Sequence, residues 1–444
     1  MAADWKVARL ADLVDIKHGF AFDGAYFRDE QPGDILLTPG NFAVGGGFKD
    51  DKIKYYSGPV PSDFILDPGD LLVTMTDLSK NGDTLGLPAL IPSLPKQRFL
   101  HNQRLGKVIV RKSAPLVKRF LYYTFCSQPY RNEVLASATG TTVKHTSPSR
   151  IAAFSLPLPP VEEQAAIAHI LGTLDDKIEL NRRMNETLEA ITRAIFKSWF
   201  VDFDPVRTKA EERQPVGVDA ETVQLFPDRL VESEFGLVPA GWRIGSPLEA
   251  ASLISGGTPR TSEVAYWGGG IRWASAKDIS QCTDAFLLET ERTITEEGLA
   301  NSATTIVPRF SSVVVARGAT TGRLTMLGED MGMNQTCYAL RSKHDAHLYL
   351  FHLLRHTIAS LVHAAHGSVF DTITTTTFVV SRVLLPPAEV CEQFEALAAP
   401  IYEKVLQNLR ESRILAAIRD ALLPKLLSGE IRVQDAAKLV GAAT

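Results

Sequence analysis

One phrase occurs twice in this sequence, and the repetition restricts the possible folds more than any other feature. The chain reads SLPLPPVEEQAAIAHILG from Ser155 and RVLLPPAEVCEQFEALAAPI from Arg382. Both copies place a double proline before glutamates, a glutamine and a long apolar-periodic stretch. Proline in a first helical turn loses no helical hydrogen bond, and glutamates there favour the positive end of the helix dipole. The phrase therefore predicts two long helices that begin alike, 227 residues apart.

Other segments recur in the same order along the chain. Each half has a tryptophan-led opening, an apolar strand that enters a Gly-containing turn, an Asn-Gln pair before an alternating strand, a helical stretch, and a glycine followed by threonines. The openings are WKVARLADLVDIKHGFAF at Trp5 and WRIGSPLEAASLISGGTP at Trp242, the strands start at Gly69 and Ser311, the pairs are Asn102-Gln103 and Asn334-Gln335, and the glycines are Gly140 and Gly367. The kept order predicts two similar α/β units, each followed by a long helix.

Both long helices carry a narrow apolar stripe. Residues 161–199 would span about 58 Å at ~1.5 Å per residue. A stripe this narrow and long is typical of a coiled-coil seam, so we expect the two helices to pack on each other. The alternative is that each helix docks separately on its own unit. The predicted seam comprises Ile167, Leu171, Leu174, Ile178, Leu188 and Ile191 in the first helix, and Phe394, Leu397, Ile401 and Val405 in the second.

The predicted boundaries follow from these elements. We expect Pro205 to end the first helix and Pro424 to kink or end the second. The stretch after Pro205 is rich in proline and charge, which predicts an extended connector with a short helical piece. The predicted segments are a first α/β unit at 1–158, a helix at 159–204, a connector at 205–240, a second α/β unit at 241–385, a helix at 386–430 and a tail at 431–444.

Composition narrows the class of protein. With 45% apolar and 22% charged residues, the 444-residue chain is typical of globular proteins with two or three domains. It has no apolar run near the ~20 residues of a membrane span and no secretory signal at its start. Its four cysteines lack metal or disulfide spacing. These features predict a cytoplasmic protein that does not associate with a membrane.

Basic residues are concentrated in one part of the chain. The net charge is −4, yet residues 90–150 carry eleven lysines and arginines against one acid, a local balance of +10. Local basic density indicates phosphate binding better than the total charge does. The alternative is a solvated basic face without a ligand.

Catalytic motifs are missing from the sequence. It has no phosphate-binding P-loop, no dinucleotide-binding glycine motif, no nucleophile elbow and no HExxH. His352 and His356 share a helical face at zinc-binding spacing, but a full set of ligands is lacking. We therefore expect neither a catalytic site nor a metal or cofactor on this chain, which would bind and position while another chain does the chemistry.

Taken together, these segments resemble the specificity subunit of type I restriction–modification systems. The most specific matches are LPLPPVEEQAAIAHILGTLDDKIELNRRMNETLEAI at Leu156, FKSWFVDFDPV at Phe196, and ISGGTPRTSEVAYWGGGIRWASAKDIS at Ile254. LVPAGWR and LLPKLLSGEIRV also fit, whereas IKHGFAFDGAYF keeps only the Gly-Phe-x-Phe form of the domain opening. The resemblance implies an α+β fold in which two target-recognition domains are joined by two long antiparallel helices with pseudo-twofold symmetry.

The resemblance also implies a function and a set of partners. Each recognition domain would read one half of a split site in double-stranded DNA, and the helices would set the spacing between the halves. Two modification subunits, which bind S-adenosylmethionine and methylate adenine, would dock on the helices. Restriction subunits that use ATP and Mg²⁺ would join them. The alternative is a stand-alone DNA-binding protein or a coiled-coil scaffold that has no methyltransferase partner.

The duplication divides the candidate DNA contacts into two groups. Residues shared by both halves favour a scaffold role, whereas residues that differ favour recognition of DNA bases, because each half must bind a different sequence. Asn102, Gln103, Asn334 and Gln335 recur, which favours a structural or phosphate-positioning role, although amides can also bind adenine. The turns after the first apolar strands differ, and they supply Lys80 and Asn81 in one half and Arg317, Thr320 and Arg323 in the other. Ordinary hairpin polarity would explain these turns equally well. The predicted phosphate contacts are Arg98, His101, Arg104, Lys144 and His145.

Overall fold

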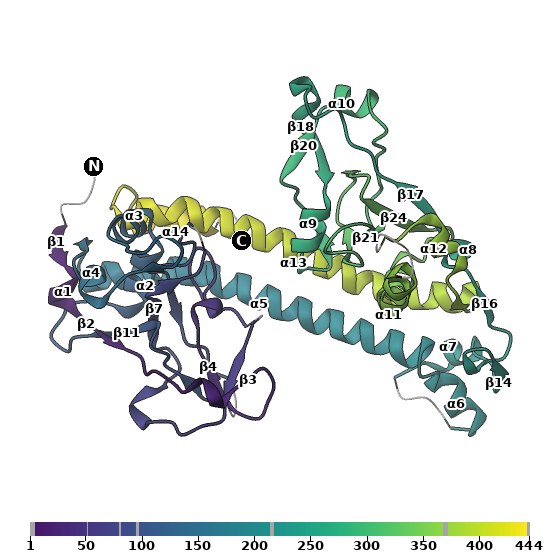
Figure 1. Cartoon of the computed structure of the whole chain (residues 1–444), viewed down its shortest axis with the longest axis horizontal. Coiled ribbons are helices and arrows are strands. Elements are labelled where there is room, and N and C mark those ends of the chain that lie inside the picture. The colour runs from purple at the N-terminus through teal and green to yellow at the C-terminus, as the bar shows by residue number, and fades with distance from the viewer. Residues whose placement is uncertain are drawn as a thin grey trace. The chain divides into compact units, whose positions relative to one another are not determined.

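A computed structural model describes residues 5–50, 52–79, 81–94, 97–213, 217–366 and 372–441. Contacts divide the chain into two compact units. Unit 1 comprises Met1–Glu179 with Ser412–Thr444, and unit 2 comprises Leu180–Glu411. The two long helices, α5 (Val161–Phe200) and α13 (Ala388–Leu427), each contribute to both units (Figure 1). In the predicted segments, by contrast, each helix stands outside the two α/β units.

The body of unit 1 is built on a four-stranded antiparallel sheet. Its strand order is β2-β11-β7-β9. A separate antiparallel pair, β1 with β13, leads into α5. The bounds are β1 Lys6–Arg9, α1 Leu10–Leu13, β2 Val14–His18, β7 Leu71–Thr74, β8 Thr76–Asp77, β9 Pro88–Leu90, β11 Leu105–Val110, α2 Lys118–Cys126, α3 Gln128–Ala136, β12 Lys144–His145, α4 Pro148–Ala152 and β13 Ser155–Leu158.

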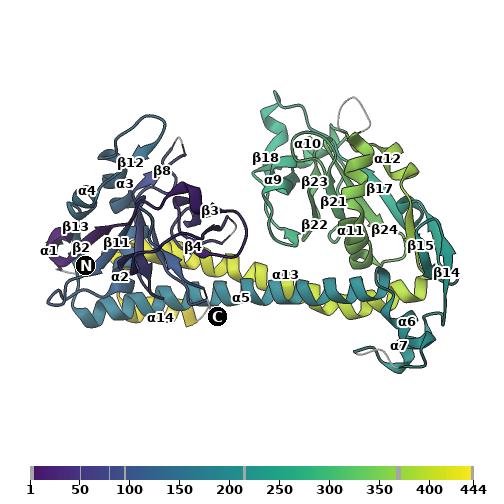
Figure 2. The same ribbon diagram turned by 60° about the horizontal axis from the view of Figure 1, so that its bottom comes forward.

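Unit 2 has a corresponding sheet with one further strand at its edge (Figure 2). Its sheet has the order β17-β24-β21-β22-β19, in which the first four strands are antiparallel and correspond to β2-β11-β7-β9. The pair β16 with β25 corresponds to β1 with β13. The match confirms the predicted duplication. The bounds are β16 Arg243–Gly245, α8 Pro247–Ala250, β17 Ala251–Ser255, β19 Phe286–Leu287, β21 Ser312–Val315, β22 Leu324–Leu327, β24 Cys337–Ser342, α11 His347–His366, α12 Thr375–Val380 and β25 Val383–Leu385.

The two units differ in a second sheet that is inserted into the shared topology. Unit 1 has five short strands in the order β3-β5-β4-β10-β6, whereas unit 2 has three in the order β20-β18-β23. The bounds are β3 Phe27–Arg28, β4 Asp34–Leu36, β5 Lys54–Tyr56, β6 Ile65–Leu66 and β10 Phe99–Leu100 in unit 1, and β18 Trp267–Ala274, α9 Ala276–Gln281, β20 Arg292–Ile294, α10 Glu296–Ala300 and β23 Gly332–Met333 in unit 2.

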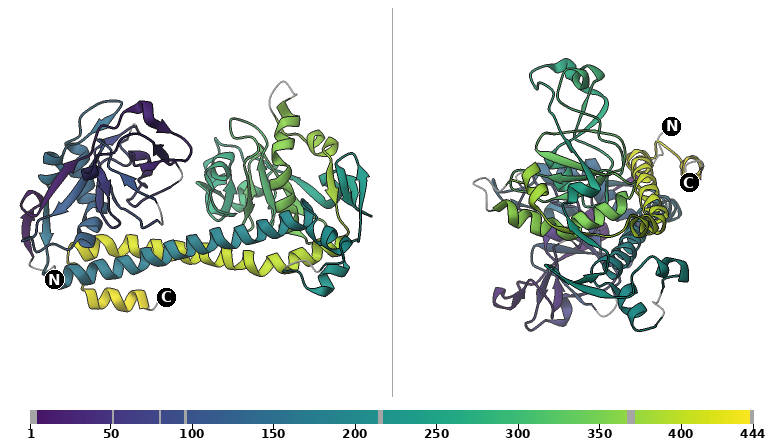
Figure 3. Two further views of the ribbon diagram at one scale, coloured as in Figure 1. Left: turned by 90° about the horizontal axis from the view of Figure 1, so that it is seen from below. Right: turned by 90° about the vertical axis from the view of Figure 1, so that its right-hand side faces the viewer.

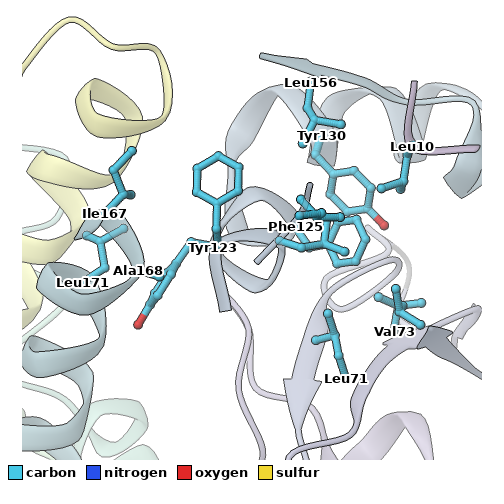
Figure 4. Packing of buried hydrophobic residues seen from close by; sticks show 14 of the residues in the cluster. Leu10, Leu71, Val73, Tyr123, Phe125, Tyr130, Leu156, Ile167, Ala168 and Leu171 are labelled. Atoms are coloured by element: carbon cyan, nitrogen blue, oxygen red, sulfur yellow. The ribbon is translucent and has the colours of Figure 1, made fainter. Parts of the chain in front are cut away.

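The core of unit 1 joins the sheet to both long helices. Tyr123, Phe125 and Tyr130 lie between the sheet strand β7 and the first turns of α5 (Figure 4). Residues Leu415 and Leu422 of α13 belong to the same core. The helix α5 therefore packs on α13 and on its own α/β body at once, so both alternatives from the sequence describe part of the packing.

The two long helices run antiparallel within each unit. In unit 1 the Nη1 atom of Arg419 on α13 lies 2.8 Å from Oδ1 of Asp175 on α5. The Nη1 atom of Arg432, which follows α13, lies 3.4 Å from Oε1 of Glu163 near the start of α5. In unit 2 the Asn408 amide nitrogen donates to Asn185 Oδ1 at 2.9 Å. Since residues later in α5 meet residues earlier in α13, the two directions are opposite.

Eight of the ten predicted seam residues are buried or half-buried, and two are exposed. Ile167, Leu171, Leu174, Phe394 and Val405 are buried, and Ile178 and Leu188 are partly buried against the two cores. Ile401 is half-buried. However, Ile191 is 45% exposed and Leu397 is 39% exposed. The neighbouring Thr192 and Ala398 take the buried positions, with Tyr402 one turn later.

The predicted connector and tail are folded. Pro205 lies in the first turn of the helix α6 (Asp204–Ala210), whereas α5 already ends at Phe200. The helix α7 and a hairpin follow, and Val206 and Phe226 enter the core of unit 2. The tail forms α14, which lies beside the ends of α5 and α13 that belong to unit 1 (Figure 3). The bounds are α7 Ala220–Gln224, β14 Leu230–Ser233, β15 Gly236–Pro239 and α14 Val433–Gly441.

Pro424 was expected to kink or end its helix, and it does not end it. The helix α13 continues past it to Leu427, and Gly429 follows with a φ of +70°. Glycine adopts this left-handed conformation without steric cost, which suits the end of a helix.

Candidate nucleic-acid interface

Three segments of unit 1 meet at one end of its main sheet. Met75, which follows β7, donates its N–H to the Arg104 carbonyl at 2.8 Å. Its own carbonyl accepts from the Thr146 N–H at 3.0 Å. The short strands β8 and β12 then pair, with Asp77 opposite Lys144. The turn after β7, the Asn-Gln turn before β11 and the threonine-containing segment before α4 therefore lie side by side.

Unit 2 contains the same backbone arrangement. Ala316, which follows β21, donates its N–H to the Thr336 carbonyl at 2.8 Å and accepts from the Ile373 N–H at 2.9 Å. These residues hold the positions of Met75, Arg104 and Thr146 in the shared topology. Gly367 lies outside the described residues. Each unit thus brings together segments that the sequence analysis selected separately.

The turn after β7 is organised by a buried carboxylate. Asp77 is 4% exposed and accepts the Ser79 N–H at 2.6 Å and the Thr84 hydroxyl at 2.7 Å, together with the Thr84 N–H. Burial raises the pKa of Asp77, but these hydrogen bonds outweigh burial and lower its pKa below the usual value. Asn81 is exposed on this turn, and Lys80 lies outside the described residues. Asn81 therefore lies in a turn whose backbone is held by hydrogen bonds to Asp77 on both sides.

The segment before α4 adds basic groups to this turn. Lys144 is half-buried and His145 is exposed. The His145 Nδ1 lies 3.2 Å from the Thr76 hydroxyl, which orients the ring. Within the described part of the chain Lys144 has no acidic partner, so its charge is available to an anion.

The Asn-Gln turns share a structural function in both units. Asn102 Oδ1 accepts the Arg104 N–H at 3.0 Å, and Asn334 Oδ1 accepts the Thr336 N–H at 2.7 Å. Each turn packs closely against a glycine, Gly19 in unit 1 and Gly256 in unit 2. A Cβ at either position would lie only 2.1 Å from the carbonyl oxygen of the asparagine, so a larger residue would not fit. The asparagines shape the turns, while the side chains of Gln103 and Gln335 are exposed.

A pocket of about 170 Å³ adjoins the Asn-Gln turn of unit 1. Phe22 and Phe27 supply aromatic walls, and Lys54 supplies a cation that the sequence analysis missed. The Gly-Phe-x-Phe opening was a signal for the aromatic part, but nothing in the local sequence connects Lys54 to a turn some fifty residues later. The pocket is lined by Phe22, Phe27, Thr38, Lys54, Asn102, Gln103 and Arg104.

The predicted phosphate contact at His101 is wrong. His101 has no exposed surface, and its Nε2 lies 2.9 Å from the Leu105 carbonyl. Burial lowers the pKa of His101 to about 4, so the ring is neutral near pH 7. A buried neutral imidazole that bonds to the Leu105 carbonyl stabilises the end of the Asn-Gln turn and cannot contact a phosphate.

Part of the basic segment is neutralised by acids from other parts of the sequence. Arg98, another predicted phosphate contact, is exposed but binds Asp34 through two hydrogen bonds of 2.9 and 2.6 Å. Further pairs are Lys107 with Asp70 at 2.6 Å, Arg111 with Asp15 at 2.8 Å, and Arg119 with Asp176 at 2.6 Å. The local balance of +10 therefore overstates the charge presented to a ligand. Among the described residues of this segment, Arg104, Lys112, Lys118, Arg131, Lys144 and Arg150 have no salt-bridge partner, although Lys118 and Arg131 donate to backbone carbonyls.

The predicted turn of unit 2 is exposed and turns sharply. Arg317, Thr320 and Arg323 are all exposed. Gly318 and Gly322 have φ values of +98° and +90°, which other residues rarely adopt. The Thr320 hydroxyl accepts a hydrogen bond of 2.7 Å from Ser280 on α9. Two arginines on a tight turn can present guanidinium groups to phosphates or to guanine.

The histidines considered as metal ligands have other surroundings. His352 is buried, its Nε2 lies 3.0 Å from the Tyr402 hydroxyl, and burial lowers its pKa to about 3. Within the described ranges, no three His, Cys, Asp or Glu side chains are grouped as metal ligands would be. No described helix is both long enough and apolar enough to span a membrane.

Comparisons with known proteins agree with this arrangement. The family described as the type I restriction modification DNA specificity domain matches residues 2–190 and, a second time, 242–396. The specificity subunit of the type I restriction enzyme HindI from Haemophilus influenzae is 29% identical over 370 residues, which are 73% of this chain and 80% of that protein. The MjaIX specificity subunit from Methanocaldococcus jannaschii is 25% identical over 363 residues, which are 77% and 75% of the two chains.

A solved structure shares the fold. The S subunit of a type I restriction–modification system from M. genitalium aligns with a TM-score of 0.61 at 15% identity, over 96% of each chain. The family matches cover each of the duplicated halves and more than half of the whole sequence. The chain therefore belongs to the type I restriction–modification DNA specificity family.

Proposed function

We propose that this chain is the DNA sequence-recognition subunit of a type I restriction–modification complex, in which each unit contacts one half of a split double-stranded target. The observation that carries the proposal is the three-segment arrangement found in both units. The backbone hydrogen bonds are the same, centred on Met75 in one unit and Ala316 in the other. The exposed side chains differ, as two half-sites of different sequence require.

The exposed groups fit two kinds of DNA contact. In unit 1, Lys144 and Arg104 would bind phosphates, because neither has an acidic partner in the described part of the chain. Asn81 would contact a base, since an amide pairs well with the major-groove edge of adenine. In unit 2, Arg317 and Arg323 have the chemistry that reads guanine. Phosphate contacts would position the protein, and base contacts would specify the sequence.

The proposed complex supplies the chemistry from other chains. Two modification subunits with S-adenosylmethionine would methylate adenine, and restriction subunits would use ATP and Mg²⁺ to cut DNA. This chain would bind no cofactor and catalyse no step. The number of modification subunits follows from the duplication, because the repeated helix starts at Val161 and Ala388 offer two similar docking surfaces.

The test is co-expression with the modification subunit, followed by genome-wide mapping of methylated adenines. We expect methylation at one asymmetric motif that consists of two short specific sequences separated by a non-specific spacer. Co-purification without any methylated motif would favour a coiled-coil scaffold. Sequence-specific DNA binding without co-purification would favour a stand-alone DNA-binding protein. Either result would refute the proposal.

A further inference from the structure

The Asn-Gln turns of the two units have the same backbone but different side-chain surroundings. The Phe20 N–H donates to the His101 carbonyl at 2.8 Å, and the Gly257 N–H donates to the Met333 carbonyl at 2.8 Å. This shared register places Ala21 of unit 1 where unit 2 has Thr258. The difference between alanine and threonine at this position determines whether the amides of the turn have partners.

In unit 2 the amides are already engaged. The Thr258 hydroxyl donates to Gln335 Oε1 and accepts from Asn334 Nδ2 at 3.2 Å. Ala21 has no hydroxyl and cannot do the same in unit 1. Among the described residues, neither Asn102 Nδ2 nor the Gln103 amide has a hydrogen-bond partner. We call the Asn-Gln pair of unit 2 closed, because both of its side chains are hydrogen-bonded to Thr258. We call the pair of unit 1 open, because it has no such partner.

The open amides border the pocket of unit 1. Lys54 and Arg104 stand on its rim, and neither has an acidic partner in the described ranges. Phe22 and Phe27 provide apolar walls. A site that combines amides, cations and an apolar wall suits a nucleotide. The amides can bind the base edge, the cations can bind the phosphate, and the apolar wall can contact the sugar.

We propose that Asn102 and Gln103 contact a base of the half-site bound by unit 1, that Lys54 and Arg104 bind the phosphates flanking that nucleotide, and that the matching turn of unit 2 makes no base contact. The inference rests on the proposed function, and it names the residues that recognise one base of one half-site. An amide presents a donor and an acceptor together, which matches adenine at N6 and N7. Unit 2 would then read its half-site through other groups, such as Arg317 and Arg323.

The experiment compares matched variants in the complex with the modification subunits, on a DNA library in which both half-sites are randomised. Gln103→Ala removes an open amide, whereas Gln335→Ala removes the closed amide at the same backbone position. Ala21→Thr adds the hydroxyl that closes the turn in unit 2. Methylated molecules are sequenced, and thermal melting of each variant confirms that it is folded.

We expect Gln103→Ala to relax the preference at one base pair of one half-site by about 5- to 150-fold, the range for loss of one good base contact. Ala21→Thr should relax the same position, and Gln335→Ala should change neither half-site. The inference is overturned if Gln103→Ala leaves the preference unchanged, or if Gln335→Ala relaxes a half-site to the same extent. If the wild-type complex methylates no split motif, the proposed function itself fails. A normal motif that is insensitive to Gln103→Ala refutes this inference alone.

Discussion

Protonation of His101 should destabilise unit 1 in mild acid, although a histidine in a basic segment looks at first like a DNA contact. Its Nε2 donates to the Leu105 carbonyl, which leaves Nδ1 as the atom that would take a proton. Nδ1 is buried and has no hydrogen-bond partner. A proton there would create a buried charge without an acceptor.

The size of the effect follows from the pKa values in the two states. Burial lowers the pKa of His101 from 6.5 to about 4 in the folded chain. Between these values the unfolded chain binds a proton that the folded chain does not, so stability is complete above pH 6.5 and falls as the pH falls toward 4. From pH 7 to pH 5 the loss should be about 2 kcal/mol.

The assay is urea denaturation at pH 7, 6 and 5, with hydrogen exchange of the β2 and β11 amides as the readout for unit 1. The comparison variant is His101→Gln, whose side-chain amide can still donate to the Leu105 carbonyl but does not titrate. We expect the wild type to lose about 2 kcal/mol more than the variant over this range. Equal losses in both proteins would show that His101 is not a buried neutral group.

Three further perturbations test other parts of the structure. Replacing both Arg104 and Lys144 by alanine should weaken binding to all DNA sequences, and the slope of log affinity against log salt should decrease by about 2; an unchanged slope would exclude them as phosphate contacts. Tyr402→Phe should lower the free energy of unfolding by about 1–3 kcal/mol, measured by denaturation, because it leaves the buried His352 Nε2 without its partner. Inserting one heptad into both α5 and α13 adds about 10 Å to each helix, so methylation mapping should show a spacer longer by roughly three base pairs with the same specific bases.

Much of the fold could be predicted because it depends on local and repeated signals. The double prolines and apolar periods predicted α5 and α13 within a few residues of their observed ends, and the duplicated order predicted two equivalent sheets. The seam was less predictable. An apolar period does not reveal that Asn181, Asn185 and Asn408 occupy buried positions, where they hydrogen-bond across the helix pair. Buried polar groups of this kind specify register in coiled coils, but in sequence they look like exposed residues.

The candidate interface was predictable at the level of segments and not of individual side chains. The sequence by itself determined the duplication, the two long helices and the identity of the three recurring segments, because these depend on patterns of residues close together in the chain. Only the tertiary structure decided that Asp34 neutralises Arg98, that His101 is buried, and that Thr258 closes one Asn-Gln turn while Ala21 leaves the other open. Each of these outcomes depends on which distant strand lies alongside, and pairing between distant strands is set by the folded core.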